Sequence, residues 1–365
     1  MDAAPIARAL LEEMERWEII DGHEHLPPER ERLAKTVDVF TLFAHYTRHD
    51  LLSAGMSTEQ YNALFDRAQP VEARWRVFAP YWERIRWTSY SRAALLAAER
   101  FYGVEDINAD NCRLLSERIR AANTPGLYHR VLREACGIRF CLTQCGLTDL
   151  GGGDLLVPLM PLVFEQQMVK AETLLQPPFA HGAAVQTLEQ YLEEVERYIV
   201  RVKREGAVGL KWVVRPNGPP DRDAARAVFE AVKSGQTLST SDWPDFPDLN
   251  PLTLYVADQA VRMATGHELV IAVHTGYWGD FRKLNPSHLI PFLYRHPKAR
   301  FDVYHLGYPY VREAIMLGKS FPNVWLNLCW THIISQRFAR DAVDEIIDTV
   351  PANKVLAFGG DYGEP

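Results

Sequence analysis

Apolar stretches of strand length, rich in β-branched residues, alternate with stretches of helical periodicity along most of the chain. Such runs are typical of parallel strands that are buried on both faces. The eight predicted strands are Trp17–Asp21, Ile138–Thr143, Leu155–Val163, Val208–Val214, Leu269–His274, Phe301–His305, Val324–Leu328 and Val355–Gly359. The helices predicted between them are Thr187–Arg204, Leu252–Thr265, Leu289–Tyr294, Tyr310–Lys319 and Arg337–Thr349. The alternation predicts an α/β protein with a (β/α)8 TIM barrel, and a doubly wound open sheet is the alternative.

A long insertion separates the first predicted strand from the second. Residues Leu26 to Gly137 are mainly helical by pattern and dense in aromatic residues. Long insertions after barrel strands often serve the substrate, so this segment is either a lid over the site or an auxiliary subdomain that packs against the barrel. The predicted organisation is an N-terminal helix and first strand in 1–25, a helical insertion in 26–137 and the remainder of the barrel in 138–365.

The sequence stops at Pro365, immediately after the eighth predicted strand, so the closing helix of the barrel is missing. The outer face of that strand needs apolar cover. Either the N-terminal helix, Ala3–Glu15, covers part of it, or the chain is a fragment of a longer protein. We expect a fragment.

Charge and composition narrow the classes of function. The 365 residues include 40 Lys plus Arg and 47 Asp plus Glu, a net charge of -7, with no basic stripe that could follow a phosphate backbone. We therefore expect no nucleic-acid partner. Met1–Trp17 reads as an amphipathic helix, and no apolar span has the length of a signal peptide core or a membrane segment. We therefore expect no membrane partner and a cytoplasmic location. The five cysteines include no CxxC pair, so we expect no disulfide framework.

The first predicted strand ends in the sequence Asp21-Gly22-His23-Glu24-His25. Residues two apart in extended backbone point to the same side, so both imidazoles face one point. That arrangement suits a divalent metal. An HxH pair alone is equally compatible with solvated or buried histidines.

Other predicted strands end in chemically similar side chains. The fifth ends at His274, the sixth at His305 and the eighth is followed by Asp361, each beside a glycine, while the fourth carries Lys211. Polar residues at the carboxyl ends of so many different strands favour the barrel over the open sheet, because barrel active sites are assembled at this face.

Together these residues resemble the pattern of the amidohydrolase superfamily. That pattern implies an HxH on strand one, a lysine on strand four, histidines on strands five and six and an aspartate on strand eight, and all five have a match between His23 and Asp361. The insertion, with Trp87-Thr88 leading to Phe101-Tyr102-Gly103, is also similar to the corresponding region of uronate isomerases, a distant branch. The resemblance implies a metal-dependent, amidohydrolase 2-like enzyme.

By this resemblance His23, His25 and Asp361 hold a divalent ion, which we expect to be zinc. His274 either completes the ligands of that ion or, with His305, holds a second one or assists the first. Asp361 would then be the general base for a metal-activated water, while His305 or His274 polarises the substrate carbonyl.

Lys211 bears on the number of ions. A carboxylated lysine could bridge two ions, whereas an ammonium would repel a nearby cation and would rather bind a substrate carboxylate or serve structurally. We expect one ion rather than two.

Further side chains follow the strands on the same face. The candidates for substrate binding are Arg215, Tyr277, Trp278 and His332. Arginine suits a carboxylate and aromatic rings can stack, but loop packing or solvation is the alternative for each. Other histidines, His45 and His49 among them, lie away from the strand ends and are expected to be structural or exposed.

The expected reaction is hydrolysis of an amide or ester-like bond in a small, carboxylate-bearing molecule. The same ligands could serve a metal-dependent decarboxylase or a uronate-isomerase-like enzyme. The alternative without catalysis is a non-catalytic barrel, or the front part of a longer fused protein. Homo-oligomers are common among such barrels, and the sequence sets no number of subunits. The substrate itself depends on loop shapes that a sequence does not specify.

Overall fold

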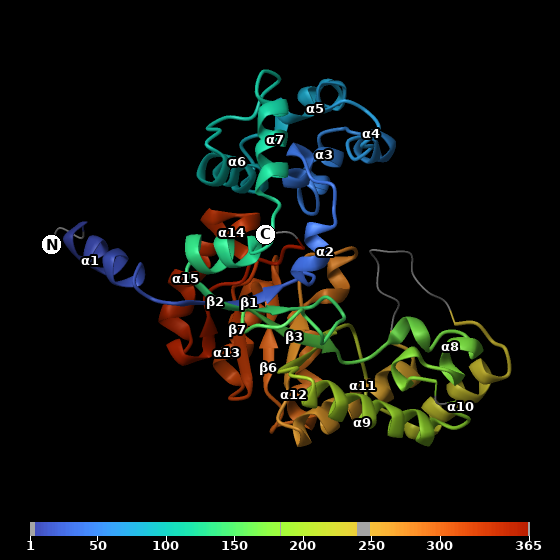
Figure 1. Cartoon of the computed structure of the whole chain (residues 1–365). Coiled ribbons are helices and arrows are strands. Elements are labelled where there is room, and N and C mark those ends of the chain that lie inside the picture. Colours follow the sequence, from blue (N-terminus) through green and yellow to red (C-terminus); the bar gives the residue numbers. More distant parts are fainter. Residues whose placement is uncertain (1–3, 183, 239–248, 364–365) are drawn as a thin grey trace.

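The computed structural model describes residues 4–182, 184–238 and 249–363 (Figure 1). Ala3 and Pro365, named above, lie outside the described residues. The strands are β1 (Ile19–Glu24), β2 (Ile138–Thr143), β3 (Leu156–Pro161), β4 (Gly209–Val213), β5 (Val270–His274), β6 (Phe301–Val303), β7 (Val324–Asn327) and β8 (Val355–Leu356).

The strands form one parallel sheet in the order β1 to β8. Backbone hydrogen bonds join its two edges beyond β8: Gly22 N donates to Phe358 O at 3.0 Å, and Asp361 N donates to His23 O at 2.8 Å. The sheet therefore curls into a nearly closed barrel. The predicted (β/α)8 fold is confirmed and the open sheet is excluded.

Helices follow the later strands on the outside of the barrel. They are α8 (Ala171–Leu175), α9 (Leu188–Arg204), α10 (Arg222–Lys233), α11 (Pro251–Gly266), α12 (Ile290–Arg295), α13 (Val311–Ser320), α14 (Thr331–Ile334) and α15 (Gln336–Thr349). The five helices predicted from periodicity begin and end within one residue of α9, α11, α12, α13 and α15. Helix α10 was not predicted, although its buried Ala225, Phe229 and Val232 follow the helical period.

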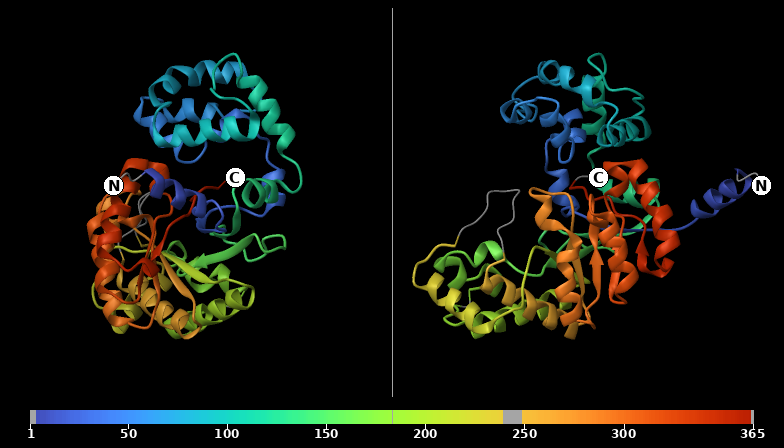
Figure 2. Two further views of the ribbon diagram at one scale, coloured as in Figure 1. Left: turned by 90° about the vertical axis from the view of Figure 1, so that its left-hand side faces the viewer. Right: turned by 180° about the vertical axis from the view of Figure 1, so that it is seen from behind.

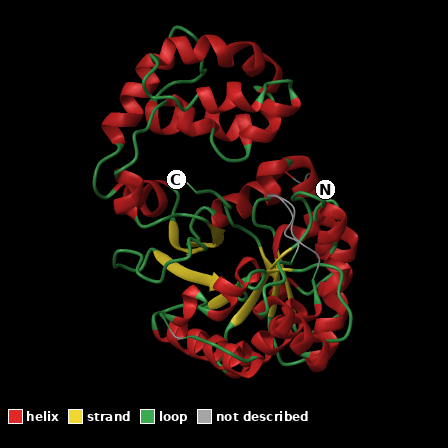
Figure 3. Ribbon diagram, turned by 90° about the vertical axis from the view of Figure 1, so that its right-hand side faces the viewer, coloured by secondary structure: helices red, strands yellow, loops and turns green. Residues whose placement is uncertain are grey.

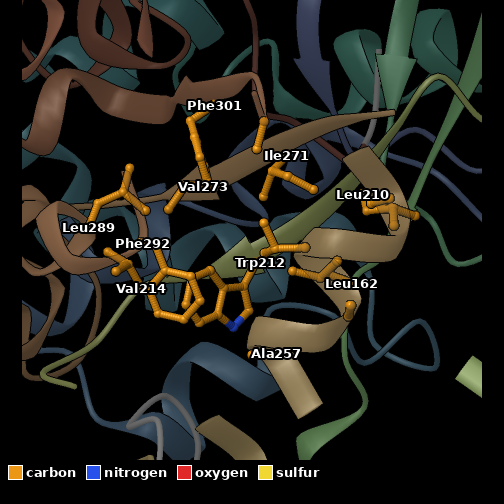
Figure 4. Close-up of a cluster of buried hydrophobic side chains, with 14 of the residues drawn as sticks. Leu162, Leu210, Trp212, Val214, Ala257, Ile271, Val273, Leu289, Phe292 and Phe301 are labelled. Carbon is orange, nitrogen blue, oxygen red and sulfur yellow. The ribbon is translucent and has the colours of Figure 1, made fainter. Parts of the chain in front are cut away.

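The main hydrophobic core lies between the strands and these helices (Figure 4). Trp212 of β4 packs against Phe292 of α12 with ring centroids 4.7 Å apart. Each fully buried side chain of this size contributes about 1.5 to 3 kcal/mol relative to exposure. This layer fixes the strands whose carboxyl ends carry the site.

The insertion between β1 and β2 is helical and has a hydrophobic core of its own. It contains α2 (Glu29–Leu33), η1 (Val39–Phe43), α3 (Thr47–Ser53), α4 (Thr58–Ala63), α5 (Val71–Ile85), α6 (Ser89–Tyr102) and α7 (Cys112–Ala122), and the π-helix η2 (His129–Ala135) leads into β2. Phe78 lies at its centre, 4.7 Å from Phe43 and 5.7 Å from Phe40 between ring centroids. Figures 2 and 3 show the insertion standing over the barrel as a separate helical layer.

The N-terminal helix α1 (Ala4–Met14) projects away from the barrel (Figure 1). Its apolar side chains Ile6, Leu10 and Met14 are more than half exposed. The alternative in which this helix covers the eighth strand is therefore wrong. Within the described residues no helix follows β8.

Two further expectations concern the whole chain. All five cysteines are free. Within residues 4–182, 184–238 and 249–363, none of the helices combines the length and apolar character that a membrane-spanning segment requires.

Candidate metal centre and substrate cavity

The carboxyl ends of β1 and β8 bring three side chains around one point. Nε2 of His23 and Nε2 of His25 each lie 3.1 Å from Oδ1 of Asp361. The three ligand atoms lie within 4.8 Å of one another. Two imidazole nitrogens and one carboxylate oxygen are the ligand set of many catalytic zinc sites.

Asp361 is held on its second oxygen by the insertion. The hydroxyl of Tyr46 donates to Oδ2 of Asp361 at 2.5 Å. Burial alone raises the pKa of this carboxyl, but the imidazoles of His23 and His25 outweigh it and hold the pKa well below its ordinary value. Asp361 is therefore a carboxylate at neutral pH.

Lys211 of β4 lies beside the first ligand. Its Nζ is 3.2 Å from Nε2 of His23 and 4.0 Å from the centroid of the Tyr304 ring. Burial lowers the pKa of Lys211 to about 8, although the nearby carboxylate of Asp361 favours the charged form. The structure therefore places the predicted lysine next to the trio, at the inner end of the site.

His274 and His305 form a chain of hydrogen bonds rather than part of the trio. Nδ1 of His305 lies 3.2 Å from the carbonyl oxygen of Cys329, which can only accept a hydrogen bond. In a neutral His305 ring, Nε2 is then an acceptor, and Nδ1 of His274 at 3.0 Å must donate to it. Burial lowers the pKa of His274 to about 3, and burial also places that of His305 well below its ordinary value, so both rings are neutral.

This assignment determines the state of the other ring nitrogen of His274, Nε2. With the proton on Nδ1, Nε2 carries a lone pair, and this buried atom has no hydrogen-bond partner among the described residues. A bare, buried nitrogen on a residue that lines the same cavity as His25 and Asp361 is suited to a cation. This observation fits the predicted role of His274 as a further ligand, with His305 orienting it.

His25 supplies a second test of whether the residues fit an ion. Its Nδ1 lies 3.0 Å from the carbonyl oxygen of Gln144, so Nδ1 carries the proton and Nε2 presents a lone pair. With its proton on Nδ1, the neutral ring leaves Nε2, 3.1 Å from Oδ1 of Asp361, free to bind a cation. The donor set therefore fits a divalent metal.

A cavity of about 720 Å³ lies between the barrel mouth and the insertion. The barrel lines it with His25, Lys211, His274, Trp278 and Asp361, and the insertion with Thr41, His45, Tyr46, Tyr90 and Ala94, among others. The volume is in the range of small-molecule sites. The insertion is thus one wall of the cavity, and not only a subdomain that packs against the barrel.

His45 corrects the sequence analysis, which expected it to be structural or exposed. It lines the cavity and stacks on Tyr46 with ring centroids 4.1 Å apart. Burial lowers the pKa of His45 to about 4. It is therefore a neutral hydrogen-bonding group in the wall of the cavity.

Of the four predicted substrate-binding residues, only Trp278 is among those that line the cavity. Arg215 is fully buried and paired with Glu165. Tyr277 stacks on Trp330, and His332 stacks on Phe358. These three therefore lie in the packing around the site.

Comparison with known proteins fits this geometry. The profile of the amidohydrolase family matches residues 162–362, more than half of the chain. The chain belongs to this family. The family implies a divalent metal, and His23, His25 and Asp361 form a possible site for it.

Individual relatives of this amidohydrolase are distant. Protein fluG of Emericella nidulans is 29% identical over 148 residues, which is 37% of this chain and only 16% of the length of fluG. Uronate isomerase from Thermotoga maritima is 15% identical with a TM-score of 0.71, over 96% of this chain and 84% of that one. A protein from Lactobacillus casei ATCC 334 that is inferred to be a metal-dependent hydrolase is 19% identical with a TM-score of 0.60, over 95% and 82% of the chains. The two structures share the fold with this amidohydrolase.

Sequence reasoning missed Tyr46, His45 and Gln144. Gln144 directly follows β2, so the strand-end rule that found the histidines could have found it. Tyr46 and His45 lie in the loop before α3, and only the docking of the insertion brings them to the barrel.

Proposed function

We propose that this amidohydrolase cleaves an amide or ester-like bond in a small, carboxylate-bearing molecule with a single zinc ion. The observation that carries the proposal is the convergence of His23, His25 and Asp361, two of which, His25 and Asp361, line the cavity. The bare Nε2 of His274 is suited to complete the site. When bound, zinc supplies Lewis acidity, which lowers the pKa of water and polarises a carbonyl.

The ionised carboxylate of Asp361 is suited to hold and move a proton. With Oδ2 hydrogen-bonded to Tyr46, the carboxylate keeps a fixed orientation toward the cavity. It can accept a proton from water and return it to the leaving group, as a general base and then a general acid. A pKa well below the ordinary value means that Asp361 is ready to accept at neutral pH.

Lys211 supports the choice of substrate class. Its Nζ lies 3.2 Å from Nε2 of His23, and the residue lines the cavity. An ammonium at this depth can pair with a substrate carboxylate. The same ammonium stands 3.2 Å from His23 Nε2 and opposes a second divalent ion nearby, which favours one ion over two.

Metal analysis tests the site. We expect about one zinc ion per chain of purified protein by elemental mass spectrometry, and loss of that zinc in His25→Asn and Asp361→Asn. His332→Asn is the matched control, because His332 also follows a strand but stacks on Phe358 and is not among the residues that line the cavity. A wild-type protein that holds no transition metal, and whose activity a chelator leaves unchanged, would remove the proposal.

Product analysis tests the reaction. A panel of N-acyl amino acids and lactones should yield the free acid and its leaving group, and the yield should disappear in Asp361→Asn. Released carbon dioxide or an isomerised sugar acid, without hydrolysis, would replace the proposed reaction and leave the metal site intact.

A further inference from the structure

Two acidic side chains stand behind the ligands in β1. Asp21 and Glu24 are both buried, and their carboxyl groups hydrogen-bond to each other. Residues three apart in a regular strand face opposite sides, but the pairing of β1 with β2 is irregular between these two positions. The irregularity allows both carboxyl groups to lie on one side of the strand, within hydrogen-bonding reach of each other.

Each carboxyl also receives a backbone N–H from the chain that follows β8. Gly360 N donates to Oδ1 of Asp21 at 3.3 Å, and Tyr362 N donates to Oε2 of Glu24 at 2.6 Å. Between them, Asp361 N donates to the carbonyl oxygen of His23 at 2.8 Å. Three successive amides are therefore tied to the strand that carries the histidine ligands.

Gly360 fits closely against this pair. A Cβ built at position 360 would overlap with the carboxyl group of Glu24. The backbone of Gly360 is not in the left-handed region, so an alanine would be acceptable there if space were available. Glu24 alone accounts for the contacts that exclude a side chain at this position.

Asp361 itself needs such support. Its φ of 63° lies in the left-handed region, which most residues with a Cβ avoid and which aspartate adopts more readily than most. The hydrogen bonds donated by Gly360 N and Tyr362 N lie directly on either side of this residue.

We propose that Asp21 and Glu24 are positioning residues that hold the Asp361 carboxylate at the metal centre through the amides of Gly360 and Tyr362. The inference rests on the proposed function, in which Asp361 is a metal ligand. Neither residue needs to touch substrate or ion, since both act through the backbone on either side of the ligand.

The test is the affinity of metal-free protein for Zn²⁺, measured by competition with a chromophoric chelator. Glu24→Gln keeps an oxygen for Tyr362 N–H and an amide donor for Asp21, so we expect affinity within about threefold of wild type. Glu24→Ala removes both, and we expect a loss of about 10- to 100-fold, the range for residues that orient metal ligands. In the same way, Asp21→Asn should keep most of the zinc affinity and Asp21→Ala should lose it. Glu194→Ala is the control for removal of a buried glutamate elsewhere in the chain.

A double variant separates this mechanism from general damage. Gly360→Ala should lose affinity because its new methyl group displaces Glu24. In Gly360→Ala/Glu24→Ala the overlap is gone, so the double variant should bind zinc no more weakly than Glu24→Ala. Losses that add in full would contradict the proposal.

Amide hydrogen exchange of residues 360–362 in metal-free protein gives a readout that does not depend on the ion. Exchange should speed up in Glu24→Ala and remain slow in Glu24→Gln. If wild type binds zinc and Glu24→Ala binds it equally with unchanged exchange, the positioning role is refuted and the metal site stands. If wild type binds no zinc, the proposed function fails, and the exchange data alone decide whether these carboxyls hold the segment.

Discussion

Asp302 of β6 shows how the site is supported at the scale of a single residue. It is buried: Asn327 Nδ2 donates to Oδ2 at 3.1 Å, and Oδ1 has no hydrogen-bond partner among the described residues. Burial raises the pKa of Asp302 to about 7, although Asn327 and Lys211 both favour its charged form. At neutral pH this acid is therefore close to its point of ionisation.

A raised pKa in the folded state predicts a pH-dependent stability. Between about pH 4 and pH 7 the unfolded chain releases the Asp302 proton while the folded chain keeps it, so this group lowers the free energy of unfolding as pH rises. The change is about 1.4 kcal/mol for each pKa unit between the two states. We would measure the free energy of unfolding of metal-free protein in urea at pH 5 and at pH 8. Between these two pH values it should fall less in Asp302→Asn than in wild type. Asp344→Asn, on an exposed position of α15, should behave like wild type, and equal losses in all three proteins would contradict the assignment.

The three candidate ligands were predictable at this scale because each one marks the end of a strand. His23, His25 and Asp361 meet as the sequence pattern predicts. The same rule placed Arg215 and His332 at the carboxyl ends of the strands. It could not show that Arg215 pairs with Glu165 or that His332 stacks on Phe358. Side-chain direction depends on neighbours that are distant in sequence, and strand position alone does not supply it.

At the scale of elements, the insertion is organised around a buried carboxylate. Asp38 pairs with Arg67 and with Arg74, whose guanidinium lies 2.7 Å from Oδ2 and also donates to the carbonyl of Leu64 at 2.8 Å. The other oxygen of Asp38 accepts from Phe40 N at 2.9 Å and caps η1. One side chain thus joins η1, the loop after α4 and helix α5.

Removal of Asp38 should lower the free energy of unfolding of the insertion more than removal of a surface charge does. In Asp38→Ala the buried guanidinium of Arg74 loses its counter-ion, and breaking such a pair costs about 3 to 5 kcal/mol. Glu117→Ala breaks an exposed pair with Arg113 and should change stability by less than about 1 kcal/mol. Urea unfolding together with limited proteolysis would measure this, with cleavage expected first within 26–137. Equal stability of the two variants would show that the buried pairs contribute little.

Elements with a regular period could be read from the sequence, and their docking could not. Helices α9 and α11 were placed to within one residue because burial repeats every three to four positions. Strand β1 was predicted to begin two residues and to end three residues too early, and its pairing is irregular at the His23 motif. The orientation of the insertion over the barrel depends on contacts between two separate cores, which no local period encodes.

At the scale of the whole molecule, those two cores meet over the metal centre. Tyr46 stacks on Tyr90 within the insertion, with ring centroids 5.3 Å apart, and packs 5.7 Å from Trp330 of the barrel. Its hydroxyl bonds to Asp361. The contact between the insertion and the barrel therefore includes Asp361, which is proposed to take part in the reaction.

Tyr46→Phe should loosen the insertion while leaving the barrel intact. The variant keeps the ring stack but loses one hydrogen bond to a carboxylate, worth about 1.5 to 3 kcal/mol, so we expect roughly 10- to 100-fold faster amide exchange by local opening in residues 39–53. Exchange in β4 and β5, whose core lies elsewhere, should not change. Tyr61→Phe is the matched control, because Tyr61 is a buried tyrosine of the insertion that is not among the residues lining the cavity. Faster exchange in both variants would trace the effect to the insertion core, and no change in Tyr46→Phe would show that the bond to Asp361 does not hold the two layers together.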